Sequence, residues 1–375
     1  MLIGIEASRA NRQKKTGVEW YAYFLIQKLK SLTESQKHSW LLYSNTPLAM
    51  GLERGPSNWH ETRLSWFPKY LWTQIRLSFE MWRRSPEVLF VPAHVLPRVI
   101  PKRTVVTIHD IGFHHFPELY KPIQRWYHEW STRDILHRAS RIITVSEFSK
   151  RELVESYYAD ASKIFVTHLG IDHERYQPLS AEQCEPILQK FRVPKPFVLF
   201  IGRLERKKNV ATLVKAFHRY KEVRGIGDPM QLVLVGQPGV GYQEIEEAIR
   251  GGESTTAIHL LGYASEEEKV ALLSSATALI HPSLYEGFGL TPLEAMACGL
   301  PVICSHAGSL PEVVGIENAL WFDPGDVDAL VRALGHLIDD PSLGATLRER
   351  GLAWCQRYTW QQTAEQTLLL LTDFV

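Results

Sequence analysis

Glu286 and Glu294 stand eight positions apart in the stretch SLYEGFGLTPLEAMACG, which begins at residue 283. Gly287 and Gly289 lie between them, and a glycine lets the backbone approach a ligand closely. The pattern predicts a helix that starts soon after these glycines, and the free N–H groups at a helix start attract anions. This chemistry favours a bound phosphate.

The same stretch also has a purely structural interpretation. Thr291, Pro292 and Glu294 fit an N-cap, a first helical residue and the third residue of a capping box. On this interpretation a helix begins at Thr291 and ends at a Gly299 C-cap. The residues by themselves leave both roles of Glu294 open.

Four cations follow the apolar run FVLFI, namely Arg203, Arg206, Lys207 and Lys208. Carboxyl ends of parallel strands meet at one edge of a sheet, where the segment EGFG is also expected. Cations at that edge suit a diphosphate, because they stabilise the charge that develops on it as it leaves. A solvated charged face is the alternative interpretation.

His109 and Asp110 follow the apolar strand VVTI, which brings them to the end of that strand. A histidine in such a place can line a binding site, and a hydrogen-bonded core histidine is the alternative. His114 and His115 also suggest metal binding. Adjacent histidines point in different directions, however, and we expect no metal site.

The candidate residues named above follow strands, so the fold must bring the ends of these strands together. Short apolar runs alternate with amphipathic segments along the chain, as in parallel strands covered by helices on both faces. The pattern predicts an α/β fold with two consecutive Rossmann-like domains. We expect strands at 2–7, 39–44, 87–93, 103–110, 141–146 and 163–170, then at 196–204, 231–236, 257–263, 277–283, 300–308 and 319–324, and first-half helices near 18–31, 69–84, 123–138 and 147–157.

The chain has 375 residues, which exceeds the size at which one hydrophobic core usually stops growing. Four prolines and no strand pattern interrupt the alternation at 176–196. We therefore expect an N-terminal domain over 1–178, a linker over 179–195 and a C-terminal domain over 196–358. The amphipathic segment 359–375 is expected to cross back onto the first domain.

The composition of the chain indicates the cellular compartment in which the protein is expected. No stretch approaches the roughly 18 to 20 apolar residues of a membrane-spanning helix, and the N-terminal apolar run is too short for a signal peptide. A cytoplasmic protein is the expectation. Cys184, Cys298, Cys304 and Cys355 show no metal-ligand spacing, which predicts reduced thiols and no structural metal.

The charge is distributed unevenly. Residues 1–180 hold 25 Lys and Arg against 17 Asp and Glu, a balance of +8, whereas residues 181–375 hold 17 against 24, a balance of −7. The first half therefore favours an anionic partner, either a lipid surface or a phosphorylated acceptor. Chance, together with complementarity between domains, is the alternative.

The predicted helix 69–84 has an apolar face with arginines beside it. Such a helix can rest on an anionic membrane. Packing of this face against the sheet of its own domain is the favoured interpretation. The apolar face consists of Leu71, Trp72, Ile75, Phe79 and Trp82.

Taken together, the segments resemble retaining GT-B glycosyltransferases of family GT4, also called glycosyl transferases group 1, and in particular bacterial mannosyltransferase-like members. The resemblance rests on GR-L-x-x-x-K at Arg203 and Lys208, on E-x7-E at Glu286 and Glu294, and on the HD segment at His109. It covers nearly the whole chain. It implies two Rossmann-like domains that face each other across a cleft.

The resemblance also implies roles for residues. Arg203 and Lys208 would neutralise the donor diphosphate, Glu286 would contact the sugar, and Glu294 would hold the ribose. Arg206 and Lys207 match no family role and are expected on a solvated or acceptor-facing surface. The further donor-binding residues implied are His109 beside the sugar, Asp110 orienting that loop, Gly17, Tyr263 near the base, and backbone amides of Gly287, Phe288, Gly289, Leu290 and Thr291 around the phosphates. Thr16 stands where the family often has a second glycine.

The implied activity is metal-independent transfer of a hexose from a nucleotide diphosphate sugar, with GDP-mannose favoured, to a hydroxyl of a glycan or lipid-linked acceptor. Such a reaction belongs to polysaccharide or lipopolysaccharide synthesis, at the inner face of the plasma membrane if the protein binds lipid. No cofactor other than the donor and no nucleic-acid partner are expected. A nucleotide-sugar 2-epimerase, a pyridoxal-dependent phosphorylase and a non-catalytic nucleotide-sugar-binding protein are the alternatives.

Overall fold

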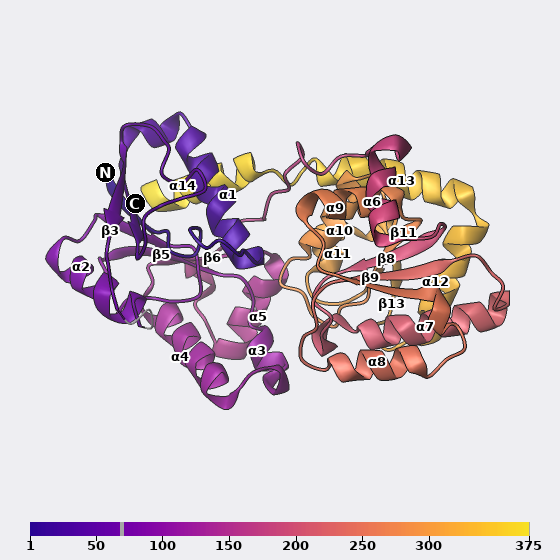
Figure 1. Cartoon of the computed structure of the whole chain (residues 1–375). Coiled ribbons are helices and arrows are strands. Elements are labelled where there is room, and N and C mark those ends of the chain that lie inside the picture. Colours follow the sequence, from indigo (N-terminus) through magenta and orange to yellow (C-terminus); the bar gives the residue numbers. More distant parts are fainter. Residues whose placement is uncertain (68–70, 375) are drawn as a thin grey trace. The chain divides into compact units, whose positions relative to one another are not determined.

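A computed structural model of the chain describes residues 1–67 and 71–374. The chain forms two units, which Figure 1 shows as separate α/β bodies. Unit 1 comprises Met1–Gly170 together with the segment from Tyr358 to the C-terminus, and unit 2 comprises Ile171–Arg357.

Unit 1 is built on a seven-stranded parallel sheet with the strand order β3-β2-β1-β4-β5-β6-β7. Its central strands are apolar and buried, as expected for strands that helices cover on both faces. The strands are β1 (Leu2–Glu6), β2 (Ser39–Ser44), β3 (Trp59–Arg63), β4 (Val88–Val91), β5 (Arg103–Ile108), β6 (Arg141–Thr144) and β7 (Ile164–Val166).

The helices of unit 1 include one from the far end of the sequence. α14 (Trp360–Thr372) packs against α1 (Gly17–Ser31), where the rings of Trp360 and Phe24 stack with centroids 5.2 Å apart. The other helices are α2 (Ser78–Arg83), α3 (Gly112–His115), α4 (Pro122–Arg138) and α5 (Glu147–Tyr157), with a π-helix η2 (Thr73–Leu77) and short 3₁₀ turns η1 (Glu34–Lys37), η3 (Pro117–Leu119) and η4 (Ala161–Lys163).

Unit 2 is built on a six-stranded parallel sheet with the strand order β10-β9-β8-β11-β12-β13. This order is that of a doubly wound Rossmann sheet. The strands are β8 (Phe197–Ile201), β9 (Gln231–Val235), β10 (Ile258–Gly262), β11 (Ala278–His281), β12 (Val302–Ser305) and β13 (Leu320–Phe322).

Helices cover both faces of the second sheet, with α7 and α8 on one side and α6, α9 and α13 on the other in Figure 1. None of the helices within the described residues has the length and apolar character needed to cross a bilayer. The helices are α6 (Ala181–Phe191), α7 (Val210–Arg224), α8 (Tyr242–Arg250), α9 (Glu266–Ser275), α10 (Leu290–Ala297), α11 (Leu310–Val314), α12 (Val327–Asp339) and α13 (Pro341–Cys355), with 3₁₀ turns η5 (Arg206–Lys208), η6 (Thr255–Ala257) and η7 (Ile316–Asn318).

The strand order reverses between β1 and β4 in unit 1 and between β8 and β11 in unit 2. Ligands of open α/β sheets bind at such switch points, outside the carboxyl ends of the strands. Arg203 follows β8 and Glu286 follows β11, so both segments emerge at the switch point of the second sheet.

The α/β prediction with two parallel sheets is confirmed, and three local expectations are wrong. β3 was not predicted, because its sequence WHETR is mostly polar and lies at the sheet edge. The segment predicted as a linker, 179–195, contains α6, whose N-cap Ser180 accepts from Gln183 N. As part of the same error in domain organisation, the boundary was expected after Pro178, whereas unit 2 begins at Ile171.

The third wrong expectation is the continuous helix 69–84. Residues 69 and 70 lie outside the described residues, and from Thr73 onward the chain forms η2 and then α2. The side of this segment that packs against the sheet is also not the predicted one, because Leu77 and Met81 are buried while Ile75, Phe79 and Trp82 are exposed.

Candidate functional site

Glu286 is the centre of a buried polar cluster at the carboxyl end of the second sheet. Its Oε1 atom lies 2.5 Å from Lys208 Nζ and 2.8 Å from His281 Nε2, and it accepts a hydrogen bond of 2.8 Å from Ser283 Oγ. Within the described part of the chain, the hydrogen bonds and ion pairs found for this carboxylate all reach Oε1. Oε2 is therefore the oxygen that can face a ligand.

The electrostatics of the cluster keep Glu286 ionised. Burial raises the pKa of this carboxyl, but Lys208, the hydrogen bond from His281 and Lys207 together hold the pKa well below its usual range. Lys208 carries three N–H donors, of which Glu286 uses one. The ammonium can therefore bind an anionic ligand without leaving its carboxylate partner.

The loop with the cations and the loop with Glu286 are joined through the backbone. Leu284 N donates to Lys207 O at 2.9 Å, and the Lys207 ammonium lies over the Tyr285 ring, 5.8 Å from its centroid. Lys207 is partly buried, so the prediction of a solvated or acceptor-facing surface holds only for part of its side chain. Arg206 is exposed and pairs with Glu244, whereas Arg203 is two-thirds exposed and lies only 3.8 Å from Glu205.

The start of α10 differs from the capping prediction. Gly289, with φ +94°, is the N-cap, so Thr291 and Pro292 are the second and third helical residues and no side chain caps the helix. The φ value favours glycine, and a Cβ at this position would also lie 2.7 Å from Leu310 Cδ2. The first amides of α10 are consequently left without a capping side chain, which suits an anion.

The end of α10 agrees with the prediction of a glycine C-cap. Gly299, with φ +71°, donates to Met296 O at 2.9 Å, and Leu300 N donates to Ala295 O at 2.9 Å. These two bonds form a Schellman motif, which closes the helix before β12.

Glu294 does not cap its helix. Its Oε2 atom lies 2.5 Å from Lys269 Nζ of α9, and both side chains are largely buried. The capping-box interpretation is therefore wrong. To bind the ribose as predicted, Glu294 would either keep its ion pair with Lys269 or give it up.

Several residues of the cluster were not predicted. His281 and Ser283 sit at the end of β11, in a segment read only as a strand, and they reach Glu286 because the chain turns back on itself. Gly308 has φ +59°, and a Cβ there would lie 2.7 Å from Glu286 O. Ser309 holds the same loop, since its Oγ donates to Glu286 O at 3.0 Å. The spacing H-x-S-x-x-E was the available signal.

Two further predicted residues lie at element boundaries. Gly17 is the first residue of α1, and a Cβ there would meet no atom of the described residues within 4 Å. Thr16 N donates to Glu19 Oε2 at 3.1 Å, so a capping box closes this helix start. Tyr263 follows β10 and its side chain is largely exposed.

His109 lies at the carboxyl end of β5 in unit 1. Its ring packs edge to face on Tyr21, with centroids 4.7 Å apart, and its buried Nε2 has no hydrogen-bond partner among the described residues. Burial lowers the pKa of His109 to about 4, although Asp110 and a bond to the Pro92 carbonyl oppose the shift. The ring is therefore neutral at pH 7, with one nitrogen available to a ligand. Asp110 Oδ1 accepts from Gly112 N at 2.8 Å, which fits its predicted role in orienting this loop.

The two adjacent histidines belong to separate ion pairs. His114 Nδ1 lies 2.9 Å from Glu129 Oε1, and His115 pairs with Glu152. Each histidine thus has one carboxylate beside it, and the two carboxylates are different ones. Across residues 1–67 and 71–374, no three His, Cys, Asp or Glu side chains are grouped as ligands of one metal ion. All four cysteines are buried and reduced, as predicted.

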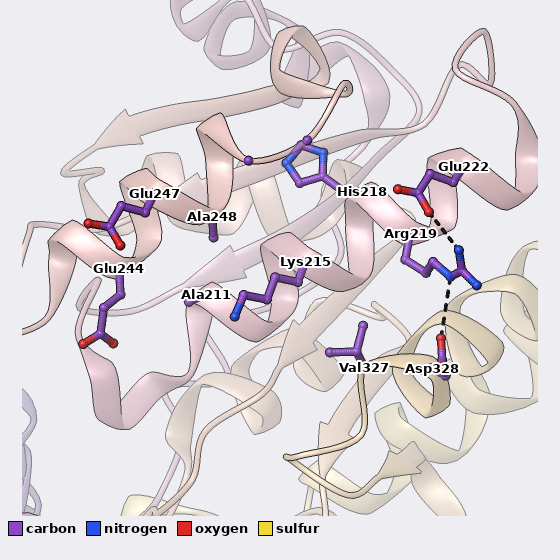
Figure 2. A pocket seen from close by; sticks show the side chains of 12 residues that line it. Ala211, Lys215, His218, Arg219, Glu222, Glu244, Glu247, Ala248, Val327 and Asp328 are labelled. Carbon is purple, nitrogen blue, oxygen red and sulfur yellow. Dashed lines mark hydrogen bonds and ion pairs between the residues drawn. The ribbon is translucent and has the colours of Figure 1, made fainter.

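A hollow of about 870 Å³ lies away from these strand ends, on the outer surface of α7, α8 and α12 (Figure 2). Figure 2 shows Lys215, Arg219, Glu244 and Asp328 around it. Arg219 is paired on both sides, with Glu222 at 2.9 Å and Asp328 at 3.8 Å. None of the residues that line this hollow was predicted to bind the donor.

Comparison with known proteins identifies the family. Residues 187–354 match the model of glycosyl transferases group 1, and residues 16–175 match the model of glycosyltransferase family 4. The O-antigen chain mannosyltransferase B of Escherichia coli is 35% identical over 278 residues, which cover 74% of this chain and 72% of that protein. The chain belongs to glycosyltransferase family 4. The resemblance drawn from the sequence motifs is confirmed, and the protein is a glycosyltransferase.

Solved structures show the same architecture for this family 4 enzyme. Sucrose-phosphate synthase from Thermosynechococcus elongatus superposes with a TM-score of 0.76 at 20% identity, covering 99% of this chain and 98% of that one. Anabaena Alr3699/HepE, solved with UDP and glucose, gives a TM-score of 0.74 at 19% identity, covering 100% and 99%. These likenesses concern the fold, and they confirm GT-B.

Proposed function

We propose that the protein transfers mannose from a nucleotide diphosphate sugar to an acceptor hydroxyl and retains the anomeric configuration. The observation that carries this proposal is the Lys208–Glu286 ion pair, which lies beside the uncapped start of α10 at the switch point of the second sheet. An ionised carboxylate suits sugar hydroxyls, and an ammonium next to free amides suits a diphosphate.

Stabilisation of the leaving diphosphate is the main catalytic effect in this proposal. Lys208, Arg203 and the amides of Gly287 to Thr291 would bind the phosphates as the bond between the sugar and the diphosphate breaks. Donors fixed in place before the reaction need no reorganisation when the charge develops. We also propose that this arrangement removes the need for a metal ion, so EDTA would leave the rate unchanged.

Retention is proposed to proceed on one face of the sugar. The acceptor hydroxyl forms its bond to the anomeric carbon on the side from which the diphosphate departs, and its proton passes to a departing phosphate oxygen. The products are the glycosylated acceptor and a nucleoside diphosphate. A covalent route would need a carboxylate nucleophile at the anomeric carbon, and Glu286 is better suited to hold the sugar because three groups fix its Oε1.

Further contacts to the donor follow from the same proposal. His109 would contact the sugar through its free Nε2, with Asp110 orienting the loop, and Glu294 would bind the ribose. Gly17 would allow the first loop to approach the diphosphate, and the backbone at Tyr263 would lie against the base.

The donor is proposed to be GDP-mannose, since the Escherichia coli relative is by name a mannosyltransferase. A UDP-hexose is the second candidate, because the Anabaena neighbour was solved with UDP and glucose. The acceptor is proposed to be a glycan or lipid-linked glycan of polysaccharide or lipopolysaccharide synthesis, in the cytoplasm or at the inner face of the plasma membrane.

The test is a transfer assay with GDP-mannose, UDP-glucose and ADP-glucose, using an extract of lipid-linked glycans as acceptor and mass spectrometry for detection. We expect mannose addition from GDP-mannose and an axial linkage in the product by NMR. A product with inverted configuration would overturn retention. Epimerisation of a free nucleotide sugar without any acceptor would overturn the transferase proposal itself.

A further inference from the structure

Residues 71–84 carry two apolar faces, of which the fold uses one. Trp72, Leu77 and Met81 are buried in the core of unit 1, and the indole N–H of Trp72 donates to Leu64 O at 2.7 Å. These three side chains attach the segment to the sheet. The predicted apolar face is not the buried one, apart from Trp72.

The second face is exposed. The side chains of Leu71, Ile75, Phe79 and Trp82 are 57%, 46%, 50% and 72% exposed. Ile75 lies in η2, and Phe79 and Trp82 lie in α2, where steps of four and three residues keep side chains on one side of the helical segment; the ring centroids of Phe79 and Trp82 are 5.8 Å apart. Leu71 precedes η2 and has a φ of +59°. Exposed apolar side chains are ordinary when scattered singly, but an ordered row of four marks an interaction surface. We call this row the apolar row.

Positive charge lies at one end of the apolar row, and Arg76 beside it pairs with Glu80 at 3.1 Å. Arg83 and Arg84 are exposed at its end, and the Arg76 guanidinium lies over the Phe79 ring, 5.8 Å from its centroid. Residues 71–84 hold three arginines and one glutamate, a balance of +2. Apolar side chains with a basic margin are complementary to an anionic lipid surface.

The first turn of α4 extends this surface. Gln74 Nε2 donates to the Tyr127 hydroxyl at 2.6 Å, which ties the row's segment to α4. In the adjoining turn Ile123 and Trp126 are 74% and 65% exposed, and Arg125 between them is exposed as well. A second helix of unit 1, joined to the row's segment by this hydrogen bond, thus also exposes large apolar and basic side chains.

A hollow of about 730 Å³ adjoins the apolar row, because residues 71–74 form one of its walls. The loop after β1 supplies Arg9 and Arg12 to the opposite lining, and the loop after β2 supplies Asn45. The hollow therefore lies at the carboxyl ends of β1 and β2, where open α/β sheets bind ligands.

The hollow has a charge that suits a phosphate. Arg9 Nη1 and Arg12 Nη1 lie 3.5 Å and 3.0 Å from the same atom, Glu19 Oε1. One carboxylate thus serves two guanidinium groups, which leaves one positive charge for a ligand. Guanidinium groups bind phosphate through paired N–H donors.

We propose that unit 1 docks on an anionic membrane through the apolar row, and that the adjoining hollow binds the phosphate of a lipid-linked acceptor. The proposal rests on the proposed function and gives it an acceptor class. A lipid-linked acceptor carries a phosphate between glycan and lipid. Its lipid would lie in the bilayer beside the row while its phosphate meets Arg9 and Arg12.

Vesicle co-sedimentation tests the docking step. The full-length protein is mixed with vesicles of phosphatidylcholine alone, or with vesicles that also contain roughly 30 to 40% phosphatidylglycerol. The anionic lipid gives the vesicle surface a negative charge, which attracts basic segments. We expect binding to the anionic vesicles, and we expect I75S/F79S/W82S to lower the partition coefficient at least about tenfold. R83Q/R84Q should lower the partition coefficient by about fivefold for each charge removed. High salt should cause most of the same loss in the wild type, because it screens the arginines.

The matched control is V223S/I226S. Val223 and Ile226 are 67% and 60% exposed in unit 2, so their replacement removes exposed apolar area from another surface. This variant should bind vesicles like the wild type. Equal loss in the control, or no binding of the wild type to anionic vesicles, would overturn the docking step. A concentration-dependent dimer that I75S/F79S/W82S abolishes would instead assign the row to a second copy of the chain.

Farnesyl diphosphate and farnesol test the hollow in solution. We expect farnesyl diphosphate to bind at least tenfold more tightly than farnesol, and R9Q/R12Q to remove that difference. Lys14 is exposed in the same loop but does not line the hollow, so K14Q is the control and should keep the difference. Because the diphosphate could also enter the donor site, the measurement is repeated with K208A, which should leave the effect of R9Q/R12Q unchanged. Equal binding in R9Q/R12Q and K14Q would overturn this step.

Failure of this inference can be told from failure of the proposed function. Donor binding is measured on the same preparations of I75S/F79S/W82S. Intact donor binding without vesicle binding supports docking by the row. If the wild type binds vesicles but binds no nucleotide sugar, the proposed function is overturned and the docking surface is still supported.

Discussion

The cluster around Glu286 in unit 2 and the apolar row in unit 1 depart from simple burial rules in opposite ways. In the cluster an ionised carboxylate is buried, 9% exposed, and three groups satisfy one of its oxygens. In the row four large apolar side chains face solvent. A buried ion pair is weak evidence for stability, and an exposed apolar row adds nothing to folding. Both features are better explained by a ligand than by the fold.

The largest expected effect is that of Lys208→Ala. This change leaves the Glu286 carboxylate buried without its cation and removes a donor to the diphosphate, so we expect kcat/KM to fall by about 10²- to 10³-fold. Arg206→Ala is the matched control, because Arg206 is exposed and pairs with Glu244. Steady-state kinetics check this. Equal losses in the two variants would mean that the cluster has no special role.

Gly308→Ala tests whether the Glu286 loop is held by backbone geometry. The added Cβ would lie 2.7 Å from Glu286 O at a φ of +59°, so we expect a loss of about 2 to 3 kcal/mol in unfolding free energy. Gly335→Ala is the control, since no described atom lies within 4 Å of its Cβ position. Urea denaturation measures both. A stability of Gly308→Ala equal to that of Gly335→Ala would contradict the account.

Acid should destabilise unit 1. Burial lowers the pKa of His94 to about 3 and that of His109 to about 4, both below the ordinary 6.5. Between pH 6.5 and 4 the unfolded chain therefore binds protons that the folded unit does not. Stability is complete above pH 6.5 and is lost as the pH falls, by about 2 kcal/mol for each of the two histidines between pH 7 and 5. Hydrogen exchange of unit 1 peptides measures this, and His109→Asn should reduce the slope. A flat profile would contradict buried neutral histidines.

Glu294→Gln and Thr291→Ala separate binding from capping within α10. Since Glu294 pairs with Lys269 and no side chain caps the helix, we expect Glu294→Gln to weaken nucleotide binding about tenfold. Thr291→Ala should change the unfolding free energy by less than about 0.5 kcal/mol. Binding titrations and melting curves check the pair. A large stability loss for Thr291→Ala would restore the capping interpretation.

The sequence allowed the strand ends that carry the candidate site of unit 2 to be placed, because its motifs directly follow apolar strands. Lys208 and Glu286 follow strands β8 and β11, and apolar runs of this kind reveal parallel strands clearly. Lys269 was missed, since only the folded chain brings it to Glu294. His281 and Ser283 were missed although they lie within five residues of Glu286 in the sequence. Thr291 was misread because Gly289, two residues earlier, can adopt the left-handed conformation that starts the helix.

The sequence was less informative for unit 1. Residues 71–84 contain apolar side chains on two faces, and periodicity does not say which face the sheet covers. β3 was missed because an edge strand needs little apolar character. An apolar face that the chain itself does not cover, such as the apolar row, cannot be told from a core-facing one by periodicity, since both have the same residue types.

Calorimetric titration of nucleotide sugars into the wild type, Lys208→Ala and Arg206→Ala tests the donor site directly. We expect the wild type to bind GDP-mannose or a UDP-hexose, Lys208→Ala to bind it at least about 30-fold more weakly, and Arg206→Ala to stay within about twofold of the wild type. Affinity in Lys208→Ala equal to that of the wild type, or no binding of any nucleotide sugar, would contradict the proposed donor site.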